Sequence, residues 1–162
     1  MVPGGRVSPG RISKPMAWVY LTDKDAATAF VEHEWQALTA SARDSGAGDV
    51  VEKAIARVVA RVRMHVASCD RNALGPAGTI PEELVSSALA LLVEEMATSI
   101  PASAVTLDEG RQRRISEAKI ELKAVMNCEL SVEQPTTPDP NGPTPDNGWY
   151  GGEDYVDFNG IR

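Results

Sequence analysis

The stretch IPEELVSSALALLVEEM, residues 80–96, decides the fold class of this chain. A proline followed by two acidic residues is a typical start of a helix. From Leu84 to Met96 the side chains are apolar on nearly all sides, which is the pattern of a helix buried by several neighbours. We therefore predict a central helix that begins at Ile80-Pro81 and ends before Ile100-Pro101.

Helical patterns also lie on both sides of this stretch. Asp49 caps a predicted helix that runs to about Ser68, because its apolar residues repeat with a period of 3.6. A last predicted helix starts at Asp108 or Glu109 and runs to about Leu130. The buried positions expected on these two helices are Val51, Ile55, Val58, Val59, Val62 and Val66, then Ile115, Ala118, Leu122, Val125 and Met126.

Upstream, the apolar residues 18–21 lead into a first predicted helix over 23–40. Thr22 or Asp23 would cap it, and Phe30, Trp35 and Leu38 would form its buried stripe. Together these patterns predict an all-α fold, a bundle of four to five helices with an extended N-terminal arm and a long proline-rich C-terminal tail. We place the flexible basic arm at 1–15, the helical domain at 16–131 and the tail at 132–162; Met16 is an alternative start.

Charge and cysteine content limit the function classes. The net charge is −7 over 162 residues, and the acidic balance disfavours tight DNA binding. Cys69 and Cys128 belong to no metal or redox motif, so we expect two reduced cysteines, with a disulfide as the alternative. The run Ala88–Val93 is too short to span a membrane and no signal peptide is visible, so the expected compartment is soluble and reducing.

A row of cations lies along one side of the predicted helix that Asp49 caps. Lys53, Arg57, Arg61 and His65 follow one another at intervals of four residues, so they line one side of the helix. The plain interpretation is a solvated face. The functional one is a contact with the acidic face or tail of a neighbouring subunit, and phosphate binding is a third.

No recognisable catalytic or metal motif is present. His33 lacks the second histidine of a zinc helix, and the adjacent pair Glu94 and Glu95 diverges by about 100° on a helix. We therefore expect no enzyme activity, no cofactor and no metal. An enzyme would need an unseen pocket built from Glu94, Glu95 or His33.

The tail combines prolines with aromatic residues. Trp149, Tyr150, Tyr155 and Phe158 are half of the aromatic residues of the chain, and five prolines precede them. Burying four such rings would gain about 15–25 kcal/mol at most, while ordering the segment costs about 14–28 kcal/mol. We therefore predict an extended segment that becomes ordered only where a partner covers it; a merely disordered tail is the alternative.

Four passages resemble the small all-helical head–tail connector proteins of tailed bacteriophages, most of all the Mu-type joining proteins. They are Val19-Tyr20-Leu21-Thr22-Asp23, the helix Val51–Val66, Ile80-Pro81-Glu82-Glu83-Leu84 and Arg114-Ile115-Ser116-Glu117-Ala118. The resemblance spans about residues 17–131.

The resemblance implies a ring of subunits, often twelve, that docks on the portal protein, joins a downstream tail or tail-terminator protein and passes DNA without binding it specifically. It also implies a place in the neck of the virion after assembly in the host cytoplasm. The expected contact residues are Trp149, Tyr150, Tyr155, Phe158, Lys53, Arg57 and Arg61. The alternative function is a cytoplasmic nucleic-acid-binding regulator that uses the edge Lys53–His65.

Overall fold

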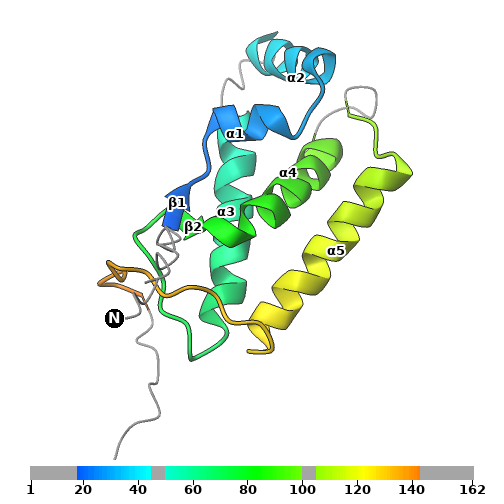
Figure 1. Cartoon of the computed structure of the whole chain (residues 1–162). Coiled ribbons are helices and arrows are strands. Elements are labelled where there is room, and N and C mark those ends of the chain that lie inside the picture. Colours follow the sequence, from blue (N-terminus) through cyan, green and yellow to red (C-terminus); the bar gives the residue numbers. More distant parts are fainter. Residues whose placement is uncertain (1–17, 45–49, 100–104, 143–162) are drawn as a thin grey trace, which may run out of the picture.

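The computed structural model describes residues 18–44, 50–99 and 105–142 (Figure 1). Within these ranges the fold is all-α, as the sequence predicted, with a small two-stranded sheet at one side. None of the helices in these ranges is both long and apolar enough to cross a membrane.

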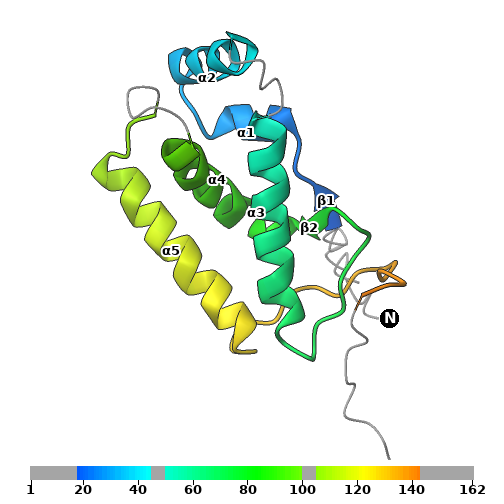
Figure 2. The same cartoon turned by 180° about the vertical axis from the view of Figure 1, so that it is seen from behind.

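The core is built around α4 (Val85–Ser99), the helix predicted to be central. It packs against α3 (Val50–Ala67) and α5 (Glu109–Met126), which also contact each other, and α1 (Asp23–Thr28) covers one end (Figures 1 and 2). The largest fully buried side chains include Leu91, Leu92, Met96, Leu122 and Val62. The predicted stripes of α3 and α5 therefore face α4, except Val51 and Met126, which are only half-buried.

The first predicted helix is two helices, so the expectation of one continuous helix over 23–40 was wrong. Thr22 caps α1 through a capping box with Asp25, and the helix ends after Thr28. The chain turns at Phe30 and continues as α2 (Glu32–Asp44). The turn buries the Phe30 ring, which stacks on Trp35 at 6.0 Å between ring centroids, and leaves Val31 exposed. The Val31 backbone N–H donates to the Glu34 carboxylate, which stabilises the start of α2.

Ile80 and Pro81 do not open the central helix. They lie in strand β2 (Thr79–Pro81), which pairs antiparallel with β1 (Trp18–Tyr20) so that Val19 faces Ile80. A short 3-10 helix, η1 (Glu82–Leu84), then leads into α4. Proline suits the end of a short edge strand, because it has no backbone N–H to donate to a partner strand.

The cysteines form a disulfide, so the expectation of two reduced thiols was wrong. Cys69 follows the end of α3 and Cys128 follows the end of α5, with 5.4 Å between their Cα atoms. Cys128 adopts a left-handed backbone conformation, with φ of 59°, which ends α5 and turns the chain toward α3. Nothing in the local sequence indicates this pairing, because 59 residues separate the two positions.

The first part of the predicted tail belongs to the folded domain. Val132 is buried in the core, and the Gln134 side chain accepts a hydrogen bond from the Ala73 backbone at 2.8 Å. The Asp139 backbone N–H donates to the Leu74 carbonyl at 2.7 Å. We call residues 131–142 the strap. The boundary expected at residue 131 is therefore misplaced, since the chain stays in contact with the domain to the neighbourhood of Gly142.

One cation organises the strap. The Arg63 guanidinium donates to the carbonyls of Gly75, Pro76 and Thr79 and forms an ion pair with Asp139 at 3.0 Å. It also lies over the Trp18 ring, 5.9 Å from its centroid. Arg63 thus joins α3, the loop after it, the sheet and the strap through one half-buried side chain.

Candidate functional site

A groove of about 520 Å³ lies where the end of α1 meets α4 and α5. Its floor is apolar, with Leu89 and Val93 from α4 and Ile115 and Ala118 from α5. Such a concave apolar surface with polar groups around it is the usual form of a binding site. The apolar patterns of α4 and α5 predict buried helices, but they do not predict this groove.

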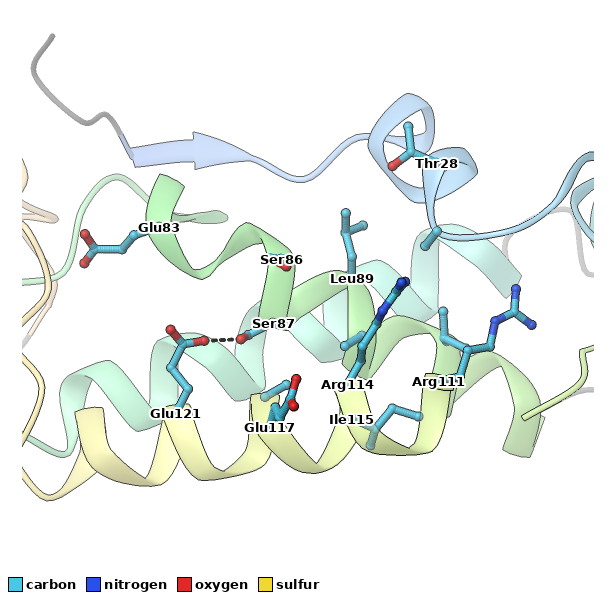
Figure 3. Close-up of a pocket in the computed structure, with 14 residues that line it drawn as sticks. Thr28, Glu83, Ser86, Ser87, Leu89, Arg111, Arg114, Ile115, Glu117 and Glu121 are labelled. Atoms are coloured by element: carbon cyan, nitrogen blue, oxygen red, sulfur yellow. Dashed lines mark hydrogen bonds between the residues drawn. The ribbon is translucent and has the colours of Figure 1, made fainter. Parts of the chain in front are cut away.

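The charged residues of the groove are separated by sign. Arg111 and Arg114 lie at the end formed by the first turns of α5, whereas Glu117, Glu121 and Glu83 lie toward the other end (Figure 3). The groove is therefore bipolar, basic at one end and acidic at the other.

Arg111 is held by a buried ion pair with Glu34. Its two terminal nitrogens donate to the two carboxylate oxygens at 2.7 and 2.6 Å, and Nη1 also donates to the Thr106 carbonyl at 2.8 Å. These hydrogen bonds from Arg111 lower the pKa of the Glu34 carboxyl to about 2. The same pair raises the pKa of the Arg111 guanidinium. Arg111 therefore lines the basic end of the groove, and its charge is already paired with Glu34.

Arg114 differs from Arg111. Its side chain is exposed and lies across the groove toward Leu89 (Figure 3). Within the described parts of the chain it makes no ion pair. Arg114 is thus a cation of the groove that is available to a ligand.

The acidic end is partly engaged within the domain. Ser87, which is buried on α4, donates a hydrogen bond to Glu121 (Figure 3). Glu117 pairs with Arg113 at 3.1 Å on the exposed face of α5. The Glu83 carboxylate accepts the backbone N–H of Glu133 at 3.0 Å, so this end of the groove touches the strap. Arg113 and Glu117 are exposed, whereas Glu121, one turn further along α5, is half-buried.

Two residues of the predicted basic edge on α3, Arg57 and Arg61, lie near an acidic residue of the same chain, Glu95. Arg57 contacts Glu95 of α4 at 2.8 Å and Arg61 contacts the same carboxylate at 3.9 Å. The His65 ring lies 2.8 Å from the Arg61 carbonyl, and Lys53 also has an interaction. Arg57 and Arg61 remain 62% and 44% exposed, so their contact with a neighbouring subunit stays a prediction. The four tail residues Trp149, Tyr150, Tyr155 and Phe158 lie outside the described residues.

The residues considered for an enzyme are not brought together in the groove. Glu94 pairs with Lys119 of α5 at 2.6 Å, Glu95 pairs with Arg57, and His33 is exposed on α2. Cys69, Asp70 and Cys128 are the one set of three metal-ligating side chains grouped within the described ranges. Because both sulfurs are bonded to each other, this set offers no thiolate for a metal.

Glu34 was not among the residues predicted to be buried, yet it is only 5% exposed. A signal existed, since Glu34 precedes the buried Leu38 by four residues and therefore lies on the same face of α2. Its partner was not visible, because Arg111 is 77 residues away.

Comparison of this chain with models of protein families, with curated proteins and with solved structures finds no match.

Proposed function

We propose that this protein is a structural component of a phage neck, a head–tail connector that assembles as a ring on the portal. The proposal starts from the resemblance of four passages to that family. Those passages form the β1 strand with the α1 cap, helix α3, the β2–η1 segment and the second turn of α5. They are the segments that build the helical core and its small sheet.

The observation that carries the proposal is the contrast between the domain and the chain beyond it. The strap is fastened to the domain up to the neighbourhood of Gly142, and the twenty residues that follow hold half of the aromatic residues. A ring of identical subunits needs a heterologous interface, in which two different surfaces meet. A folded domain with an open groove and a separate aromatic segment supplies two such surfaces.

The charge balance fits the same role. A ring that surrounds DNA without gripping it should not present a large excess of cations. The chain has 23 acidic and 16 basic residues. Glu95 moreover neutralises part of the most regular basic row, on α3.

Electron microscopy of the full-length protein mixed with the portal protein from the same viral genome tests the proposal. We expect rings coaxial with the portal. A variant with Trp149, Tyr150, Tyr155 and Phe158 changed to serine should fold normally by circular dichroism but lose this assembly. A control variant with Asn147→Ser and Asn159→Ser in the same segment should keep it. Absence of rings and of portal complexes with the folded wild-type chain would contradict the proposal.

The nucleic-acid-binding alternative depends on the α3 edge. Arg57 and Arg61 are exposed enough to reach a phosphate, but Glu95 competes for both. Binding through them would weaken steeply with salt. Fluorescence anisotropy with a DNA duplex at 50 mM salt separates the two functions, because a connector should show no salt-sensitive complex there.

A further inference from the structure

We infer that the groove between α1, α4 and α5 is the receptor for the C-terminal segment Asp157–Arg162 of a second copy of this chain. The inference rests on the proposed function, since it specifies how neighbouring subunits are joined. It places the receptor of the tail in the groove and not at the α3 edge, where Glu95 already pairs with Arg57 and lies near Arg61.

The first argument is the order of charges. In the segment DFNGIR, an acid at Asp157 is followed by the apolar Phe158 and Ile161 and then by the cation Arg162. The groove presents the complementary polarity, with Arg114 toward one end, Glu117 and Glu121 toward the other, and a floor that includes the apolar Leu89 and Ile115 (Figure 3). A peptide placed in one direction would pair both of its charges, and a peptide placed in reverse would set like charges together.

The second argument is length. In an extended chain, Asp157 and Arg162 are about 17 Å apart at about 3.3 Å per residue. Arg114 and Glu121 are about 10 Å apart along α5 at 1.5 Å per residue, and Glu83 extends the acidic end beyond Glu121 (Figure 3). The long side chains of Arg114 and Arg162 span the difference.

The third argument is the state of the groove cations. Arg111 is fully engaged by Glu34 and Thr106, so it shapes the basic end without needing a ligand. Arg114 points across the apolar floor and forms no ion pair within the described ranges. A carboxylate from a second copy would form an ion pair with Arg114, and an aromatic ring next to that carboxylate would cover Leu89.

The direction of the strap favours a neighbouring copy as the donor. The last described part of the strap lies beside the sheet, and both views place it on the side of the domain away from α5 (Figures 1 and 2). From Gly142 to Asp157 the chain can extend about 47 Å at about 3.1 Å per residue. A segment of that reach that starts beside the sheet can cross to the next subunit, and repetition of the contact generates a ring.

A fluorescein-labelled peptide of residues 153–162 tests the receptor. It is titrated into the full-length protein that carries Asp157→Lys and Phe158→Ala, so that the protein's own tail does not compete. We expect saturable anisotropy, at least tenfold weaker binding when Arg114→Glu is added, and no change when Lys123→Glu is added. Lys123 is an exposed cation on the same helix outside the groove, so it is the matched control.

A charge exchange excludes an indirect effect of the substitution. The peptide with Asp157→Lys should bind the Arg114→Glu protein at least tenfold more tightly than the unmodified peptide does. No saturable binding of the unmodified peptide, or equal binding by the Arg114→Glu and Lys123→Glu proteins, would overturn the inference.

Complementation decides whether the contact joins two copies. Full-length protein with Arg114→Glu retains a tail, and full-length protein with Asp157→Lys and Phe158→Ala retains a groove. We expect a mixture of the two to form a dimer by light scattering, while each alone stays monomeric. A mixture that stays monomeric despite peptide binding would overturn the intersubunit contact, because neither protein in it can fill its own groove with its own tail. Rings on the portal that persist with Arg114→Glu would refute this groove as receptor but leave the connector function standing.

Discussion

At the scale of single residues, the ion pair between Glu34 and Arg111 joins α2 to the first turn of α5. The pKa of Glu34 in the folded protein is about 2, below the ordinary value of 4.5. Its carboxylate therefore contributes stability that is complete above pH 4.5 and is lost as the pH falls toward 2.

Substitution Glu34→Gln should therefore lower the free energy of unfolding by roughly 3 kcal/mol at pH 7. The difference between the variant and the wild type should shrink as the pH falls from about 4.5 toward 2. Urea denaturation at a series of pH values measures it. Glu117→Gln is the control, because its pair with Arg113 is exposed and should contribute no more than about 1 kcal/mol. A difference that does not depend on pH would contradict the assigned pKa.

At the scale of elements, the disulfide fastens the end of α3 to the end of α5. Closing a loop of about 60 residues stabilises a fold by about 4 kcal/mol in the chain-entropy model. The variant with Cys69→Ala and Cys128→Ala should therefore melt at a lower temperature than the oxidised wild type. A thiol reductant should lower the melting temperature of the wild type by a similar amount and leave the variant unchanged. Equal melting of the wild type with and without reductant would show that the bond is not formed in solution.

Elements with local signals were predictable from the sequence. The Thr22 cap, the Asp108 cap and the apolar stripes of α3 and α5 depend on neighbours a few residues away, and they lie where the patterns placed them. The α1–α2 turn was missed because its reason is tertiary. It buries Phe30 and directs Glu34 to a partner on α5.

Features that join distant segments were not predictable. The pairing of Val19 with Ile80 and the Cys69–Cys128 bond each connect positions more than 50 residues apart. The groove likewise combines residues from the end of α1, from α4 and from α5, which are far apart in the sequence. Its charged residues read, in sequence, as an ordinary solvated helix face.

At the scale of the whole molecule, Arg63 joins the strap to α3, to the loop after α3 and to the sheet. Its guanidinium satisfies three loop carbonyls and the Asp139 carboxylate at once, so an apolar replacement leaves all of them without this partner. Removing one member of a buried pair costs about 3–5 kcal/mol. Arg63→Met should therefore free the strap while the α4–α5 packing, which Arg63 does not touch, persists.

Hydrogen–deuterium exchange of the full-length protein separates strap release from general unfolding. In Arg63→Met we expect faster exchange at residues 132–142 and unchanged exchange at 115–125 in α5. Arg63→Lys should be intermediate, because an ammonium cannot reproduce the forked geometry that reaches the carbonyls and Asp139 together. If exchange in the strap stayed slow in Arg63→Met, the other contacts of the strap, among them those of Val132, Gln134 and the Asp139 N–H, would be enough to hold it without this cation. If the strap is freed, the proposed assembly on the portal should weaken, even though the groove and the aromatic residues are unchanged in this variant.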